Sequence, residues 1–63
     1  MKFHILSIDS AETADRLKAT LSASEPGATI DINVDQKTVT IDSDASEETF
    51  RQLITAAGHT IDQ

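Results

Sequence analysis

Hydrophobic and polar residues alternate along two neighbouring segments in the middle of the chain. Ile30, Ile32 and Val34 alternate with polar residues, and Val39 and Ile41 repeat the pattern after a short polar turn. Because successive side chains of a strand point to opposite faces, this period of two predicts an antiparallel hairpin with one apolar and one solvated face. The solvated face is predicted to carry Asp31, Asn33, Asp35, Thr38, Thr40 and Asp42.

A segment before the hairpin has apolar residues at helical spacing. Either Asp9 or Ser10 can cap this helix, because a short oxygen-bearing side chain accepts from the free backbone N–H groups of the first turn. Pro26 and Gly27 end it and turn the chain. Its apolar face consists of Ala11, Ala14, Leu17 and Leu21.

A second helix is predicted after the hairpin, with Asp44 or Ser46 as its cap. Gly58 is expected to end it in the left-handed conformation that glycine adopts without penalty. Its apolar stripe is Phe50, Leu53, Ile54 and Ala57.

Short apolar stretches at the two ends complete the pattern. Phe3, Ile5 and Ile8 predict a first strand with His4 on the opposite face, and His59 to Ile61 leaves room for a short last strand. The order βαββαβ predicts an α+β, ferredoxin-like two-layer sandwich: a four-stranded antiparallel sheet with two helices on one face. We expect residues 1–63 to form one domain.

The charge balance narrows the choice of partner. The chain has 11 acidic and 5 basic residues and a net charge of −6. Nucleic acids and anionic membranes attract clustered Lys and Arg, so neither is expected to bind. A protein with a basic docking surface is the partner that this charge favours. No stretch has the length of a membrane-spanning helix and no targeting segment is evident, so we expect a cytoplasmic monomer.

Few residues carry candidate chemistry. The chain has no cysteine, which excludes disulfides and thiolate metal sites, and its two glycines cannot form a glycine-rich phosphate loop. A domain of this size does not enclose a pocket, and no oxyanion-hole motif accompanies its serines. We therefore do not expect an enzyme.

Several short pieces together resemble the heavy-metal-associated family, which includes copper chaperones and the N-terminal modules of metal-pumping ATPases. Met1 to Ile5 is similar to the family's first strand, and Pro26-Gly27-Ala28 to its Pro-Gly-Val turn. Residues 33–41 are similar to its hairpin, and Ala56-Ala57-Gly58-His59 to its Ala-Gly-Tyr ending. The resemblance covers nearly the whole chain and implies the same ferredoxin-like fold.

The metal motif of that family, Met-x-Cys-x-x-Cys, is degenerate in this chain. Ile8 stands at the methionine position, and Ser10 and Thr13 stand at the cysteine positions. Soft ions such as Cu(I) require thiolates, so the resemblance implies weak or no soft-metal binding. His59 matches a position that lies beside the metal loop in the family.

Two functional hypotheses follow. In the first, the protein is related to metal chaperones and metal transport proteins, but its thiolate site is lost. Ser10, Thr13 and His59 are then the candidate metal positions, with no certain cofactor beyond a weakly bound divalent ion. In the second, it is a metal-independent interaction module that docks through the helix start or the open sheet. A small-ligand regulatory domain ranks after both.

Overall fold

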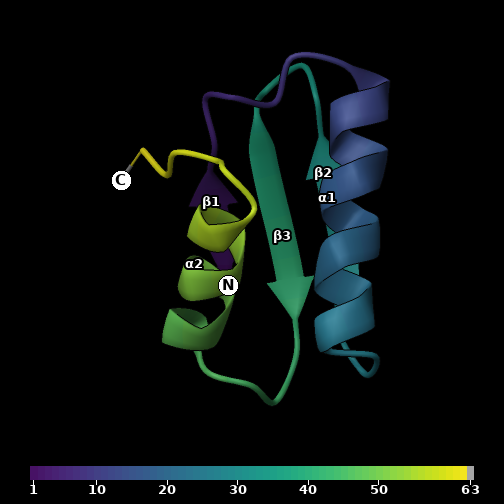
Figure 1. The fold of residues 1–63 in the computed structure, drawn as a ribbon, viewed down its shortest axis with the longest axis vertical. Helices are drawn as coiled ribbons and strands as arrows, with labels where there is room; N and C mark the ends of the chain where they lie inside the picture. The colour runs from purple at the N-terminus through teal and green to yellow at the C-terminus, as the bar shows by residue number, and fades with distance from the viewer. Residues whose placement is uncertain (63) are drawn as a thin grey trace.

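The computed structural model describes residues 1–62, and its strands and helices follow the order β1-α1-β2-β3-α2 (Figure 1). The sheet has the strand order β1-β3-β2, and both pairings are antiparallel. Both helices lie on one side of the sheet, α1 beside β2 and α2 beside β1 (Figure 1). The bounds are β1 Lys2–His4, α1 Ala11–Ser24, β2 Thr29–Asn33, β3 Thr38–Asp42 and α2 Glu47–Ala56.

The hydrophobic core lies between the helices and the sheet. Its members come from the apolar faces that the sequence predicts. Of the other residues predicted for those faces, Ile32, Val34 and Leu53 are only partly buried, and Ala11 and Ala57 are exposed at the ends of their helices. No polar side chain is buried among the described residues. The buried residues are Phe3, Ile5, Ile8, Ala14, Leu17, Leu21, Ile30, Val39, Ile41, Phe50 and Ile54.

Serine side chains cap both helices. Ser10 and Ser46 each accept a hydrogen bond from the backbone N–H three residues later, at 3.2 Å. Of the two candidates at each helix, the structure thus selects the serine, because the N-cap oxygen must reach the N–H groups of the first turn. Gly58 has a φ of 92°, which confirms the left-handed end of α2.

The predicted fourth strand is wrong for the described residues, which form a three-stranded sheet. Segment 59–62 meets β1 through an isolated bridge between Ile5 and Ile61 and a hydrogen bond from the Asp62 N–H to the His4 carbonyl. The backbone N–H of His59 is instead bound to the carbonyl of Ile54. Within this segment, only Ile61 and Asp62 therefore pair with the β1 side of the sheet.

The first strand is also shorter than predicted. It ends at His4, and a turn in which the Ile8 N–H binds the Ile5 carbonyl follows. Ile8 is fully buried, so its apolar side chain belongs to the core without belonging to a strand. The break in strict alternation between Ile5 and Ile8 reflects this turn.

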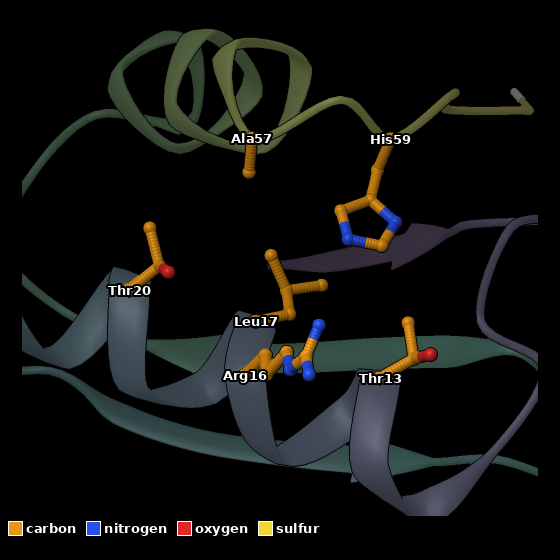
Figure 2. A pocket seen from close by; sticks show the side chains of 6 residues that line it. All are labelled: Thr13, Arg16, Leu17, Thr20, Ala57 and His59. Atoms are coloured by element: carbon orange, nitrogen blue, oxygen red, sulfur yellow. The ribbon is translucent and has the colours of Figure 1, made fainter.

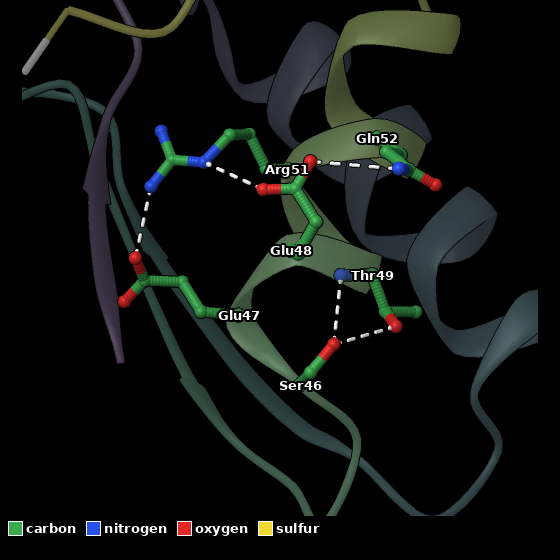
Figure 3. A network of polar contacts seen from close by, with 6 residues as sticks. All are labelled: Ser46, Glu47, Glu48, Thr49, Arg51 and Gln52. Atoms are coloured by element: carbon green, nitrogen blue, oxygen red, sulfur yellow. Dashed lines mark hydrogen bonds and ion pairs between the residues drawn. The ribbon is translucent and has the colours of Figure 1, made fainter.

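The first turn of α2 carries a network of charged side chains (Figure 3). The Arg51 guanidinium pairs with Glu47 at 2.8 Å and with Glu48 at 3.7 Å, and it lies 5.6 Å from the centre of the Phe3 ring. The network therefore connects α2 to β1. No described helix is both long enough and apolar enough to cross a membrane.

Candidate functional site

The start of α1 holds a chain of hydrogen bonds at the positions that match the metal motif. Thr13 Oγ1 donates to Asp9 Oδ1 at 2.9 Å, and Thr13 Oγ1 and Ser10 Oγ are 3.2 Å apart. A hydroxyl has a single proton, so the Thr13 proton used for Asp9 leaves Ser10 as the donor to Thr13. Both hydroxyl protons are thus engaged inside this cap network of Asp9, Ser10 and Thr13.

His59 is placed beside the loop that connects β1 to α1. Its Nδ1 lies 2.7 Å from Ser7 Oγ, so a hydrogen bond joins the two side chains across the end of the molecule. His59 itself is half-buried. Because Nδ1 is engaged with Ser7, a ligand would have to use Nε2 or break this contact.

A shallow cavity of about 360 Å³ lies between α1 and the end of α2 (Figure 2). Thr13 and His59 line it together, whereas Ser10 is not among its lining residues. The structure therefore brings two of the three candidate positions to one cavity and leaves the third in the cap network. The remaining lining residues are Arg16, Leu17, Thr20 and Ala57.

Lys37 links the β2–β3 turn to the same loop. Its Nζ donates to the backbone carbonyl of Ile8, and its own carbonyl accepts from the Ile5 N–H at 2.8 Å. Lys37 also has a φ of 56°, the left-handed conformation of a turn residue. The ammonium group of Lys37 is thus bound at the carbonyl of Ile8, two residues before Ser10.

Sequence reasoning did not identify Ser7, Lys37 or Arg16 as neighbours of the candidate site. The helical spacing of Thr13, Arg16 and Thr20 places them on one face of α1 and could have indicated the cavity wall. Nothing in the spacing of Ser7 and His59, which are 52 positions apart, indicates their contact.

Solved structures show which proteins share this architecture. An anaerobic, side-to-side form of the copper-trafficking protein Atx1 superposes with a TM-score of 0.91 at 26% identity, over 98% of each chain. The Cu2 form of the copper chaperone Atx1 from Synechocystis PCC6803 superposes with a TM-score of 0.89 at 26% identity, again over 98% of each chain. The chain has the fold of the Atx1-like copper chaperones. It is a heavy-metal-associated fold, as the sequence resemblance implies.

A gold-binding protein also has this heavy-metal-associated fold, with a TM-score of 0.90 at 22% identity over 98% of each chain. No protein-family model matches the sequence, and no curated protein sequence matches it significantly. The likeness therefore rests on structure, and the function must be argued from the residues of this chain.

The donor atoms at the motif positions are not those that a soft metal ion prefers. The sequence has no cysteine. Across residues 1–62, no three His, Asp or Glu side chains come close enough together to hold a metal ion. Cu(I) prefers thiolate and thioether ligands, whereas the motif positions here offer neutral hydroxyls.

Proposed function

We propose that this protein is a metal-chaperone-like, heavy-metal-associated domain that has lost the thiolate metal site and binds soft metal ions weakly or not at all. The observation that carries the proposal is the cap network, in which Ser10 and Thr13 bind each other and Asp9. These hydrogen bonds engage the hydroxyl protons of Ser10 and Thr13 within the helix start. We propose no catalytic activity for the domain.

Hard ions such as Ca²⁺ are also expected to bind weakly to Asp9, Ser10 and Thr13. Ca²⁺ takes six to eight oxygen ligands. The cap network supplies one carboxylate and two neutral hydroxyls, which is fewer oxygen ligands than Ca²⁺ takes. A divalent ion at His59 would have one imidazole, whose Nδ1 is bound to Ser7. We propose that any divalent metal binds weakly here.

A competition titration tests the proposal. The protein is mixed with a coloured Cu(I)–chelator complex under anaerobic conditions, and release of the free chelator is followed by absorbance. We expect the natural protein to leave the complex intact. The matched control is the double variant Ser10→Cys, Thr13→Cys, which restores both thiolates on the same backbone and should withdraw Cu(I) stoichiometrically.

Two outcomes would contradict the proposal. Withdrawal of Cu(I) by the natural protein would show that non-thiolate ligands suffice. Failure of a folded double variant to bind Cu(I) would show that features other than the missing thiolates disable the site. Circular dichroism of both proteins establishes that they are folded before the titration is interpreted.

Metal-independent protein docking is a second candidate function, and Leu6 favours it. Its side chain is 51% exposed in the loop before α1, and it is the large hydrophobic residue left uncovered in residues 1–62. We propose that the protein is a cytoplasmic monomer and that its net charge of −6 directs it to a basic surface on a partner protein.

Sedimentation equilibrium tests whether Leu6 is available to another protein. A monomer at high micromolar concentration leaves this side chain free for a partner. Self-association that the variant Leu6→Ser abolishes would instead assign Leu6 to contacts between copies of the chain, and would contradict the proposed monomer.

A further inference from the structure

Strand β2 lies at the edge of the sheet. Within residues 1–62 it pairs with β3 alone, and its other side has no neighbouring strand. An exposed edge presents backbone N–H and C=O groups that can pair with a further strand. Edge strands of this kind are the sites at which extended peptides add to a sheet.

The register identifies the backbone groups that face outward. Met1 and Ile41 exchange hydrogen bonds, and the Ile5 N–H binds the Lys37 carbonyl, so odd-numbered residues of β3 and its turn bind β1. Successive backbone groups of a strand point to opposite sides. The even-numbered residues of β3 therefore bind Thr29, Asp31 and Asn33, their partners in the register. Ile30 and Ile32 direct their N–H and C=O groups to the open edge.

A groove of about 250 Å³ runs between this edge and α1. Ile32 and Val34 line it from the strand side and are only half-buried, although their side chains pack against the core. Ala11 and Ala14 line it from the helix side. Because alanine ends at Cβ, the start of α1 does not cover the strand there, and apolar surface stays open beside the unpaired backbone.

The charges along the edge strand favour a basic occupant. Asp15 and Lys18 line the groove from α1 with opposite charges. Asp31, by contrast, alternates with Ile30 and Ile32 and so places its carboxylate on the solvated face of β2, beside any strand that adds to the edge. The chain as a whole carries a net charge of −6, so a basic segment is attracted before it docks.

A second copy of the chain fits this edge poorly. Asp31 is the central residue of β2 (Thr29–Asn33). A symmetric antiparallel pairing about that centre would place the Asp31 carboxylates of two copies directly opposite each other, and like charges at such positions destabilise the pair. Each copy would also bring its net charge of −6.

We propose that the β2 edge and its groove bind an extended, basic segment of a partner protein, which adds as a strand and places an apolar side chain between Ala14 and Ile32. Lys or Arg side chains of the segment would meet Asp31. The proposal rests on the docking function proposed for this protein and is independent of the metal titration, so either can fail alone.

A blocked seven-residue peptide of alternating lysine and valine serves as the probe. It is titrated into ¹⁵N-labelled protein at low salt, and amide signals are followed by NMR. We expect shifts concentrated in residues 29–34 and 11–18. The same peptide, N-methylated at alternate residues, cannot pair its backbone and should bind about tenfold more weakly or worse.

Two charge reversals separate the edge from general attraction. Asp31→Lys removes the carboxylate at the centre of β2 and should weaken binding about three- to tenfold. Asp42→Lys changes the net charge equally at an exposed residue of β3, which is not the edge strand and does not line the groove, and should have a smaller effect. Thermal unfolding of both variants verifies that they fold.

Several results would overturn the proposal. The first is an equal loss of peptide affinity in the two variants, and the second is equal affinity for the peptide with and without N-methylation. The others are amide shifts centred on the loop near Leu6, or no amide shift at a millimolar concentration of peptide. Concentration-dependent shifts of residues 29–34 in the protein alone would assign the edge to a second copy instead. Selective loss with Asp31→Lys and with N-methylation would establish the edge as the docking site.

Discussion

The hydroxyl of Ser7 lies 2.7 Å from Nδ1 of His59, and this contact joins the loop before α1 to the segment after α2. The same segment meets β1 through the Ile5–Ile61 bridge and the Asp62–His4 backbone bond. Side-chain and backbone contacts together therefore fix the end of the described chain against its beginning.

The contact between Ser7 and His59 is expected to contribute measurably to stability. Ser7→Ala and His59→Ala should each lower the free energy of unfolding by about 0.5–1.5 kcal/mol, the usual net value of one hydrogen bond. The double variant should lose less than the sum, because each single change already removes the shared bond. Urea denaturation of all four proteins measures the coupling; strictly additive losses would refute it.

Ile8 is expected to tolerate the methionine that the family motif has at this position. Ile8→Met nearly conserves volume and should cost less than about 1.5 kcal/mol. Ile8→Ala leaves a cavity at a fully buried position and should cost about 2–5 kcal/mol. The stability of a domain this small is of the order of 3–9 kcal/mol, so the alanine variant should be largely unfolded by mild urea. Equal midpoints for the two variants would contradict this assignment.

The two glycines are expected to respond differently to alanine. Gly58 has a φ of 92°, and a Cβ in the left-handed region costs about 1–2 kcal/mol. Gly27 lies outside that region, and a Cβ there would meet no atom within 4 Å, so Gly27→Ala should be neutral or slightly stabilising. Thermal unfolding compares them. A larger loss at Gly27 than at Gly58 would show that backbone conformation does not decide the outcome.

The two Arg–Glu pairs at i,i+4 spacing should differ in how much they contribute to the free energy of unfolding. The pair of Arg16 and Glu12 is 79% and 75% exposed, so Arg16→Ala should change stability by no more than about 0.5 kcal/mol. Arg51 is 35% exposed and lies over the Phe3 ring, so Arg51→Ala should cost about 1 kcal/mol more. Urea denaturation at two salt concentrations measures the free energy of unfolding of both variants. Equal losses of stability in the two would contradict the role of the Phe3 ring.

Much of the fold follows from local patterns in the sequence. The alternation of Ile30, Ile32, Val39 and Ile41 predicts the hairpin, and helical spacing predicts the two helices that cover one face of its sheet. The four-stranded sheet was not predictable in the same way. The last segment has too few residues to show a period, and the bond from His59 to Ile54 shortens the part that can run beside β1.

The sequence by itself determined the chemistry at the helix start: no cysteine, Ser10 and Thr13 at the motif positions, and an oxygen-bearing cap, Asp9 or Ser10, in reach of the first turn. These are properties of neighbouring residues, and covalent connectivity alone brings them together. Tertiary structure decided that Thr13 shares a cavity with His59, that Ser7 binds His59, and that Lys37 reaches the Ile8 carbonyl. Those contacts join residues far apart in the chain, and only the packing of both helices on the sheet sets their distances.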